Sequence, residues 1–131
     1  MKKNGILNSD ISKVLSDMGH KDFICIGDCG LPVPQGVKKI DLALKFGEPS
    51  FIDTLKEVYN DMHVEKIILA KEIKTKNKEQ LKAIEQLFGK IDIEFVSHED
   101  FKKKTCYAKA IIRTGEITPF SNIILISNVC F

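Results

Sequence analysis

Along almost the whole chain, short apolar runs alternate with segments in which apolar residues recur every three or four positions. The apolar runs are typical of buried strands, whereas apolar residues at i, i+3, i+4 and i+7 are typical of a helix with one face against a core. The strand-like runs span residues 23–26, 37–44, 64–70, 91–96, 108–113 and 123–129, and the helix-like segments span residues 9–18, 50–62 and 77–88 and resume at Ser97. An alternation of about six strands with about four helices predicts an α/β fold.

The order of these segments predicts a three-layer α/β/α architecture, in which helices cover both faces of a central mixed sheet. Only a turn that contains Gly115 and Pro119 separates the last two strand-like runs, so we expect these two strands to be antiparallel. No linker, repeat or low-complexity segment interrupts the chain, and we expect one domain over residues 1–131. Ligands of such sheets bind where loops leave the carboxyl ends of strands, and the loop that begins at Asp28 has this position.

Several helix ends carry recognisable signals. Asn8 or Ser9 can cap the first helix, and Asn77 followed three positions later by Gln80 is typical of a helix start. Gly19 follows the first helix, and we expect it to be the left-handed residue that ends this helix.

The composition is that of a globular protein, since 44% of the residues are apolar and 29% are charged. The 20 basic and 18 acidic residues give a formal charge of +2, which does not favour a nucleic-acid partner. No apolar run approaches the length of a membrane span, and the first residues lack the apolar stretch of a signal peptide. We therefore expect a cytoplasmic protein without a membrane contact.

The four cysteines are Cys25, Cys29, Cys106 and Cys130. Their spacing matches no zinc motif, and no nearby histidine completes a set of ligands. In a reducing compartment we expect free thiols and no metal site.

Patterns alone nominate a few polar residues. His20 follows the first helix, His98 lies in the first turn of the last helix, and Asp28 directly follows a strand-like run. Taken alone, a histidine in such a position is more often structural, and Asp28 can equally be a turn residue that binds its own backbone. No dinucleotide-binding, P-loop or nucleophile-elbow motif occurs. These patterns therefore predict an α/β domain with a candidate His and Asp site.

Four stretches of the sequence resemble the ribose pyranase and fucose mutarotase family. They are NSDISKVLSDMGHKD (residues 8–22), DCGLPVP (28–34), KIDLALK (39–45) and RTGEITPFSN (113–122). The resemblance extends over the whole chain, and the combination of MGH, DxGLPVP and RTGExTP is highly specific. It implies an enzyme that interconverts the pyranose and furanose forms of a free sugar, which is D-ribose in the branch that this chain fits.

The resemblance also implies roles for individual residues. The resemblance implies that His20, in the MGH segment, is the proton donor. This residue type suits the role, because a histidine titrates near neutral pH and can both give and take a proton. The implied substrate-binding residues are Asp28, His98, Phe120, Ser121 and Asn122. The family pattern usually has Tyr where this chain has Phe120, so the hydrogen bond of that hydroxyl is lost while contacts of the ring face remain available.

No cofactor and no metal are expected, since ring opening and reclosure need only proton transfer. The resemblance implies a homo-oligomer, a decamer of two stacked pentameric rings, with the sugar site near a subunit boundary. The apolar run at residues 123–131 suits burial, either in the sheet or against a neighbouring copy. Two alternative functions remain: a mutarotase acting on a related sugar, and a cytoplasmic sugar-binding module without turnover.

Overall fold

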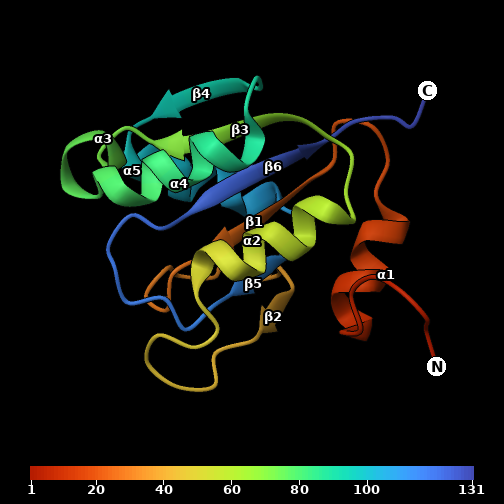
Figure 1. Cartoon of the computed structure of the whole chain (residues 1–131). Helices are drawn as coiled ribbons and strands as arrows, with labels where there is room; N and C mark the ends of the chain where they lie inside the picture. Colours follow the sequence, from red (N-terminus) through yellow and green to blue (C-terminus); the bar gives the residue numbers. More distant parts are fainter.

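The computed structural model describes residues Met1 to Phe131 and contains one six-stranded sheet (Figure 1). The strands are β1 (Phe23–Gly27), β2 (Lys39–Asp41), β3 (Val64–Ala70), β4 (Asp92–Val96), β5 (Ile111–Arg113) and β6 (Ile123–Ser127). The helices are α1 (Ser9–Asp17), α2 (Phe51–Asn60), α3 (Ile73–Lys76), α4 (Lys78–Phe88), α5 (His98–Lys104) and the 3-10 helix η1 (Thr105–Tyr107). None of these helices has the length and apolar character needed to cross a membrane.

The strands lie in the order β2-β5-β1-β6-β3-β4. Neighbouring strands are parallel except on the two sides of β6, which runs antiparallel to both β1 and β3. The predicted mixed sheet is therefore confirmed. The last two strands do run in opposite directions, but they are not neighbours, because β1 lies between β5 and β6.

Alternate residues of the central strands bury their side chains on opposite faces of the sheet. Ile24 and Ile26 of β1 belong to a core that α1, α2 and α4 cover, whereas Cys25 belongs to a second core that includes Phe101 of α5. All four side chains are fully buried, and burial of each large one contributes about 1.5–3 kcal/mol to stability. Figure 1 shows α2 and α4 in front of the sheet and α5 behind it. The predicted three-layer architecture is confirmed.

Side-chain caps define where the helices begin. The side-chain oxygens of Asn8, Asn77 and Ser97 each accept a hydrogen bond from the backbone N–H three residues later, at 2.9, 3.3 and 3.1 Å. These predicted helix starts are confirmed. The left-handed conformation predicted for Gly19 is wrong, because the extended backbone of Met18 (φ −71°, ψ 137°) already ends α1.

Three elements differ clearly from the sequence prediction in extent, namely α3, β2 and β5. The pattern did not predict α3, because a helix of four residues is too short to show an apolar period. β2 covers only three residues of the predicted run 37–44, because this strand lies at the edge of the sheet and pairs only with β5. β5 covers only Ile111–Arg113 of the predicted run 108–113.

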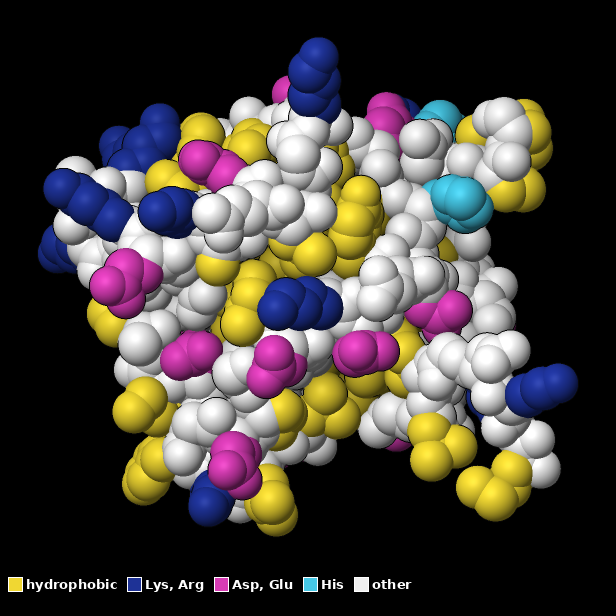
Figure 2. Space-filling view, viewed as in Figure 1, with side chains coloured by type: hydrophobic (Ala, Val, Ile, Leu, Met, Phe, Trp, Pro, Cys, Tyr) yellow, Lys and Arg dark blue, Asp and Glu magenta, His cyan; other side chains and the backbone are white.

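Charged side chains of both signs are interspersed over the face seen in Figure 2. The densest group of basic side chains in this view lies over α3, which contributes Lys74 and Lys76. Lys74 is also partly covered, since its ammonium group lies 3.8 Å from the centre of the Phe95 ring. The face therefore presents mixed charge, as the formal charge of +2 leads one to expect.

Gly115 packs directly against the backbone of the loop that precedes α2. A side chain there would place its Cβ 2.3 Å from the carbonyl oxygen of Glu48 and 2.5 Å from that of Lys45. Gly115 N donates to Pro49 O (2.9 Å), and Gly115 O accepts from Gly47 N (2.6 Å). This contact fixes the start of the segment that leads into β6.

Gly115→Ala is expected to lower the free energy of unfolding by about 1–3 kcal/mol, because backbone atoms rather than a flexible side chain must move. Gly19→Ala is the matched control, since its Cβ would meet nothing closer than Asp22 Oδ2 at 3.8 Å. Urea denaturation of the wild type and both variants measures the difference. Equal stability of the two variants would contradict this account of the contact.

Candidate active site

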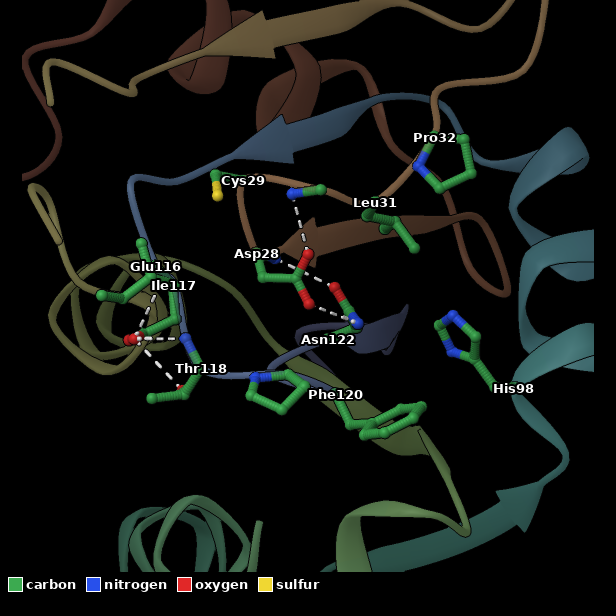
Figure 3. Close-up of a pocket in the computed structure, with 12 residues that line it drawn as sticks. Asp28, Cys29, Leu31, Pro32, His98, Glu116, Ile117, Thr118, Phe120 and Asn122 are labelled. Atoms are coloured by element: carbon green, nitrogen blue, oxygen red, sulfur yellow. Dashed lines mark hydrogen bonds between the residues drawn. The ribbon is translucent and has the colours of Figure 1, made fainter. Parts of the chain in front are cut away.

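A cavity of about 340 Å³ lies at the carboxyl end of β1. Three segments form its wall: the loop after β1, the start of α5, and the stretch that leads into β6 (Figure 3). Of the residues predicted to form the site, Asp28, His98, Phe120 and Asn122 line this cavity. The loop expected to bind a ligand is therefore part of a real concave site.

Strand pairing brings Asp28 next to Asn122, although 94 residues separate them in the sequence. Because β6 runs antiparallel to β1, the residue that follows β1 and the residue that precedes β6 meet at one edge of the sheet. Asp28 N donates to Asn122 Oδ1 (2.9 Å), and Asn122 Nδ2 donates to Asp28 Oδ2 (3.0 Å). Gly30 N donates to the other carboxylate oxygen of Asp28 (3.0 Å). These bonds hold the carboxylate at the cavity wall.

Burial raises the pKa of the Asp28 carboxyl above the ordinary value of 3.8. The hydrogen bonds from Gly30 and from the Asn122 side chain oppose this rise in pKa without cancelling it. A carboxylate that is partly removed from water is a strong acceptor for any hydroxyl group that enters the cavity.

His98 projects from the first turn of α5 toward Phe120 and Asn122 (Figure 3). Its backbone N–H donates to both carboxylate oxygens of Glu72, at 3.2 and 3.0 Å, which fixes the start of the helix. Its ring stands edge-on to the Phe120 ring, with the ring centres 5.1 Å apart. Nδ1 of His98 is buried and has no hydrogen-bond partner. A buried nitrogen without a partner, on a residue that lines a cavity, is the kind of group that a bound ligand or an ordered water satisfies.

Phe120 and Ser121 occupy adjacent but different environments. Phe120 lines the cavity and has a left-handed backbone (φ 59°), which is uncommon for a bulky residue. Ser121 is fully buried behind the wall, and its hydroxyl lies 2.8 Å from that of Thr118. The Ser121 side chain therefore supports the loop and does not face the cavity.

His20 lies at the other end of β1. The five residues of this strand span about 17 Å at about 3.3 Å per residue, so His20 does not line the cavity of its own chain. Its Nε2 lies 2.9 Å from Glu65 Oε2, and Lys21 pairs with the other oxygen of the same carboxylate. His20 instead lines a hollow of about 290 Å³ that it shares with Phe131 at the end of the chain. Figure 2 shows histidine side chains at the side where the C-terminus lies.

Sequence reasoning missed Glu116, although this residue lies within the RTGEITPFSN stretch. Its Oε1 accepts from Phe51 N (3.1 Å), and its Oε2 accepts from the backbone N–H groups of Ile117 (3.2 Å) and Thr118 (3.3 Å). The available signal was the position of this acidic residue in the predicted turn that contains Gly115 and Pro119. Glu116 lines the cavity, but its oxygens are occupied by the framework of the loop.

Two further observations concern possible ligand contacts. Lys102 pairs with Glu99 (2.6 Å) and does not line the cavity. No three His, Cys, Asp or Glu side chains come together in a cluster that could hold a metal ion. All four cysteines are free thiols, as predicted.

A sequence profile of the RbsD / FucU transport protein family matches residues 1–130, and the chain belongs to this family. Relatives named D-ribose pyranase come from Oenococcus oeni (58% identical) and Bacillus cytotoxicus (54%), each over 131 residues that cover 100% of both chains. The structure of Bacillus subtilis RbsD complexed with D-ribose is 56% identical and covers 100% of both chains with a TM-score of 0.98. The fucose mutarotase of Streptococcus pneumoniae, in complex with L-fucose, shares the fold at 23% identity and a TM-score of 0.82 over 95% of both chains.

The raised pKa of Asp28 predicts a pH dependence of stability. Between pH 3.8 and the raised pKa, the folded chain retains a proton that the unfolded chain has lost. The stability that Asp28 contributes is therefore fully present below its unfolded pKa and is lost as the pH rises through its folded pKa. The free energy of unfolding of the wild type, relative to Asp28→Asn, should fall as the pH rises from below 3.8 through the raised pKa. Urea denaturation at half-unit intervals measures this difference, and a flat or rising difference would contradict the raised pKa.

Proposed function

We propose that this chain interconverts the pyranose and furanose ring forms of free D-ribose, which is the activity of a D-ribose pyranase. The observation that carries the proposal is the full-length similarity to proteins of that name and to a homologue complexed with D-ribose. A cavity of about 340 Å³ with a carboxylate, an amide and an imidazole in its wall suits a small polyhydroxylated ligand.

The reaction requires two coordinated proton movements. The ring oxygen gains a proton while the anomeric hydroxyl loses one, which opens the ring to the aldehyde. Attack by a different hydroxyl then closes a ring of the other size. A histidine can supply and remove these protons near neutral pH, and no electron transfer is needed, so the proposal includes no cofactor.

Four residues of the wall are proposed to hold the sugar. The Asp28 carboxylate accepts hydrogen bonds from sugar hydroxyls, and Asn122 fixes its orientation. The unpartnered Nδ1 of His98 is satisfied by another hydroxyl. The Phe120 ring packs against the C–H face of the sugar, a contact that needs no side-chain hydroxyl. Holding the open chain among these groups favours reclosure in a defined geometry.

His20 is proposed to act as the general acid and base from a neighbouring copy of the chain. Within one chain this residue lies beyond the far end of β1, a strand whose five residues span about 17 Å, and the cavity lies at the other end. The hollow that holds His20 also holds the fully exposed Phe131, and the wall of the sugar cavity carries the exposed Ile117. Two exposed apolar residues on different faces suit a head-to-tail contact, which closes into a ring when it is repeated. We therefore retain the predicted decamer of two pentameric rings as part of the proposal.

The remaining elements of the proposal concern the setting. Residues 1–131 are proposed to act as one domain, which the single sheet and the family match over residues 1–130 support. A cytoplasmic location agrees with four unpaired cysteines. No nucleic-acid or membrane partner is part of the proposal.

Saturation-transfer NMR of D-ribose, with and without the protein, tests the activity. The wild type is expected to accelerate exchange between pyranose and furanose signals. His20→Ala should lower this rate by about 100-fold or more while leaving D-ribose binding in place, because a general acid and base is lost. Binding without ring exchange by the wild type would favour the sugar-binding module, and exchange of anomers alone would favour a mutarotase.

Subunit complementation tests whether His20 acts across a boundary. His20→Ala and Asp28→Asn should each be nearly inactive, but a co-expressed equal mixture should regain about a quarter of the wild-type rate. In a random head-to-tail ring, about one boundary in four pairs an intact cavity with an intact His20. The same variants mixed only after purification, without subunit exchange, are the control. A co-expressed mixture no more active than its parents would contradict a shared site.

A further inference from the structure

The backbone of Phe120 is held in a conformation that the residue does not favour. Its φ of 59° lies in the left-handed region, which is unfavourable for a bulky residue and persists only where the surroundings enforce it. The peptide bond between Pro119 and Phe120 sets the direction of the ring, which stands edge-on to His98 across the cavity wall. Whatever fixes the plane of this peptide therefore fixes one side of the sugar site.

The side chain of Asn77 makes that contact. Its Nδ2 donates to Pro119 O (2.8 Å), which is the carbonyl of the peptide bond that precedes Phe120. The same nitrogen donates to Thr118 Oγ1 (3.2 Å) and Ser121 Oγ (3.1 Å), so one amide group binds both sides of the strained residue. Its Oδ1 accepts from the backbone N–H of α4 and caps that helix. Asn77 thus joins the start of α4 to the loop that carries Phe120.

Gln80, in the first turn of α4, reinforces this contact. Gln80 Nε2 donates to Ser121 Oγ at 3.0 Å, and Ser121 Oγ lies 2.8 Å from Thr118 Oγ1. Ser121 is fully buried, so its hydroxyl has these side chains as partners in place of water. The amide of Asn77 is the group in this network that reaches the backbone next to Phe120.

We propose that Asn77 is a positioning residue of the sugar site, which holds the Pro119–Phe120 peptide so that the Phe120 ring faces the ligand. This inference rests on the proposed function only in taking D-ribose as the ligand. Asn77 does not line the cavity, and its effect passes entirely through the loop.

Asn77→Asp separates this role from helix capping. Aspartate keeps the shape of the side chain and caps a helix as well as asparagine does. It replaces the donating amide with an acceptor oxygen, which then faces the carbonyl oxygen of Pro119 without a hydrogen between them. Asn8→Asp is the matched control, because Asn8 caps α1 in the same way while its amide nitrogen has no partner in the protein.

Titration calorimetry with D-ribose should show about 10-fold or greater loss of affinity in Asn77→Asp and less than about twofold change in Asn8→Asp. The ring-exchange rate at saturating D-ribose should fall by less than about threefold, because Asn77 touches no reacting atom. Hydrogen–deuterium exchange should rise in residues 114–122 of Asn77→Asp and stay unchanged in the control. Wild-type affinity in Asn77→Asp would overturn the proposal.

The test also gives an answer in three other cases. If Asn77→Asp does not fold, Asn77→Ser retains a capping oxygen and lacks the amide, and unchanged D-ribose affinity in that variant would overturn the proposal. If the wild type binds D-ribose without exchanging its ring forms, the proposed catalysis fails while the comparison of affinities still decides the role of Asn77. If the wild type does not bind D-ribose, hydrogen exchange in residues 114–122 decides it: raised exchange supports the role, and unchanged exchange overturns it.

Discussion

The antiparallel insertion of β6 between β1 and β3 is the constraint on which the cavity depends. In an all-parallel sheet, all strands begin at one end of the sheet and finish at the other. A residue that precedes one strand would then lie far from a residue that follows its neighbour. Here the pairing of Ile26 with Ile123 brings the exit of β1 and the entry of β6 together. Residues 123 to 125 are fully buried, so the apolar core keeps β6 in this position.

The cavity wall consists of loops, yet polar contacts from neighbouring elements fix these loops in place. Glu116 ties the loop before β6 to the start of α2, and Glu72 ties the loop after β3 to the start of α5. Both carboxylates accept hydrogen bonds from backbone N–H groups near helix starts, where negative charge is also favoured by the helix dipole. The partial positive charge at the starts of α2 and α5 therefore helps to hold the loops that form the cavity wall.

Much of this organisation could be predicted from the sequence, because it depends on apolar periodicity and on local caps. The strands buried on both faces and the caps at Asn8, Asn77 and Ser97 are of this kind. The position of Asp28 after β1 also followed from the order of the segments.

What the sequence could not reveal depends on contacts between distant segments. The mutual hydrogen bonds of Asp28 and Asn122 span 94 residues, and no local pattern encodes them. The resemblance implies that Ser121 binds substrate, and no sequence pattern shows that its hydroxyl is buried against Gln80 and Thr118. Gly19 failed as a left-handed helix end because the chain becomes extended one residue earlier. The distance between His20 and the cavity likewise depends on which end of β1 each occupies.

The composition of the cavity wall has a chemical consequence. The chain carries 20 Lys and Arg residues, yet none of them lines the cavity. An aldose whose ring has opened is an electrophilic aldehyde, and a primary amine held against it would condense to an imine and lose water. A wall of carboxylate, amide, imidazole and aromatic groups offers no such amine. An aldehyde formed against this wall therefore meets no amine of the same wall with which it could condense to an imine.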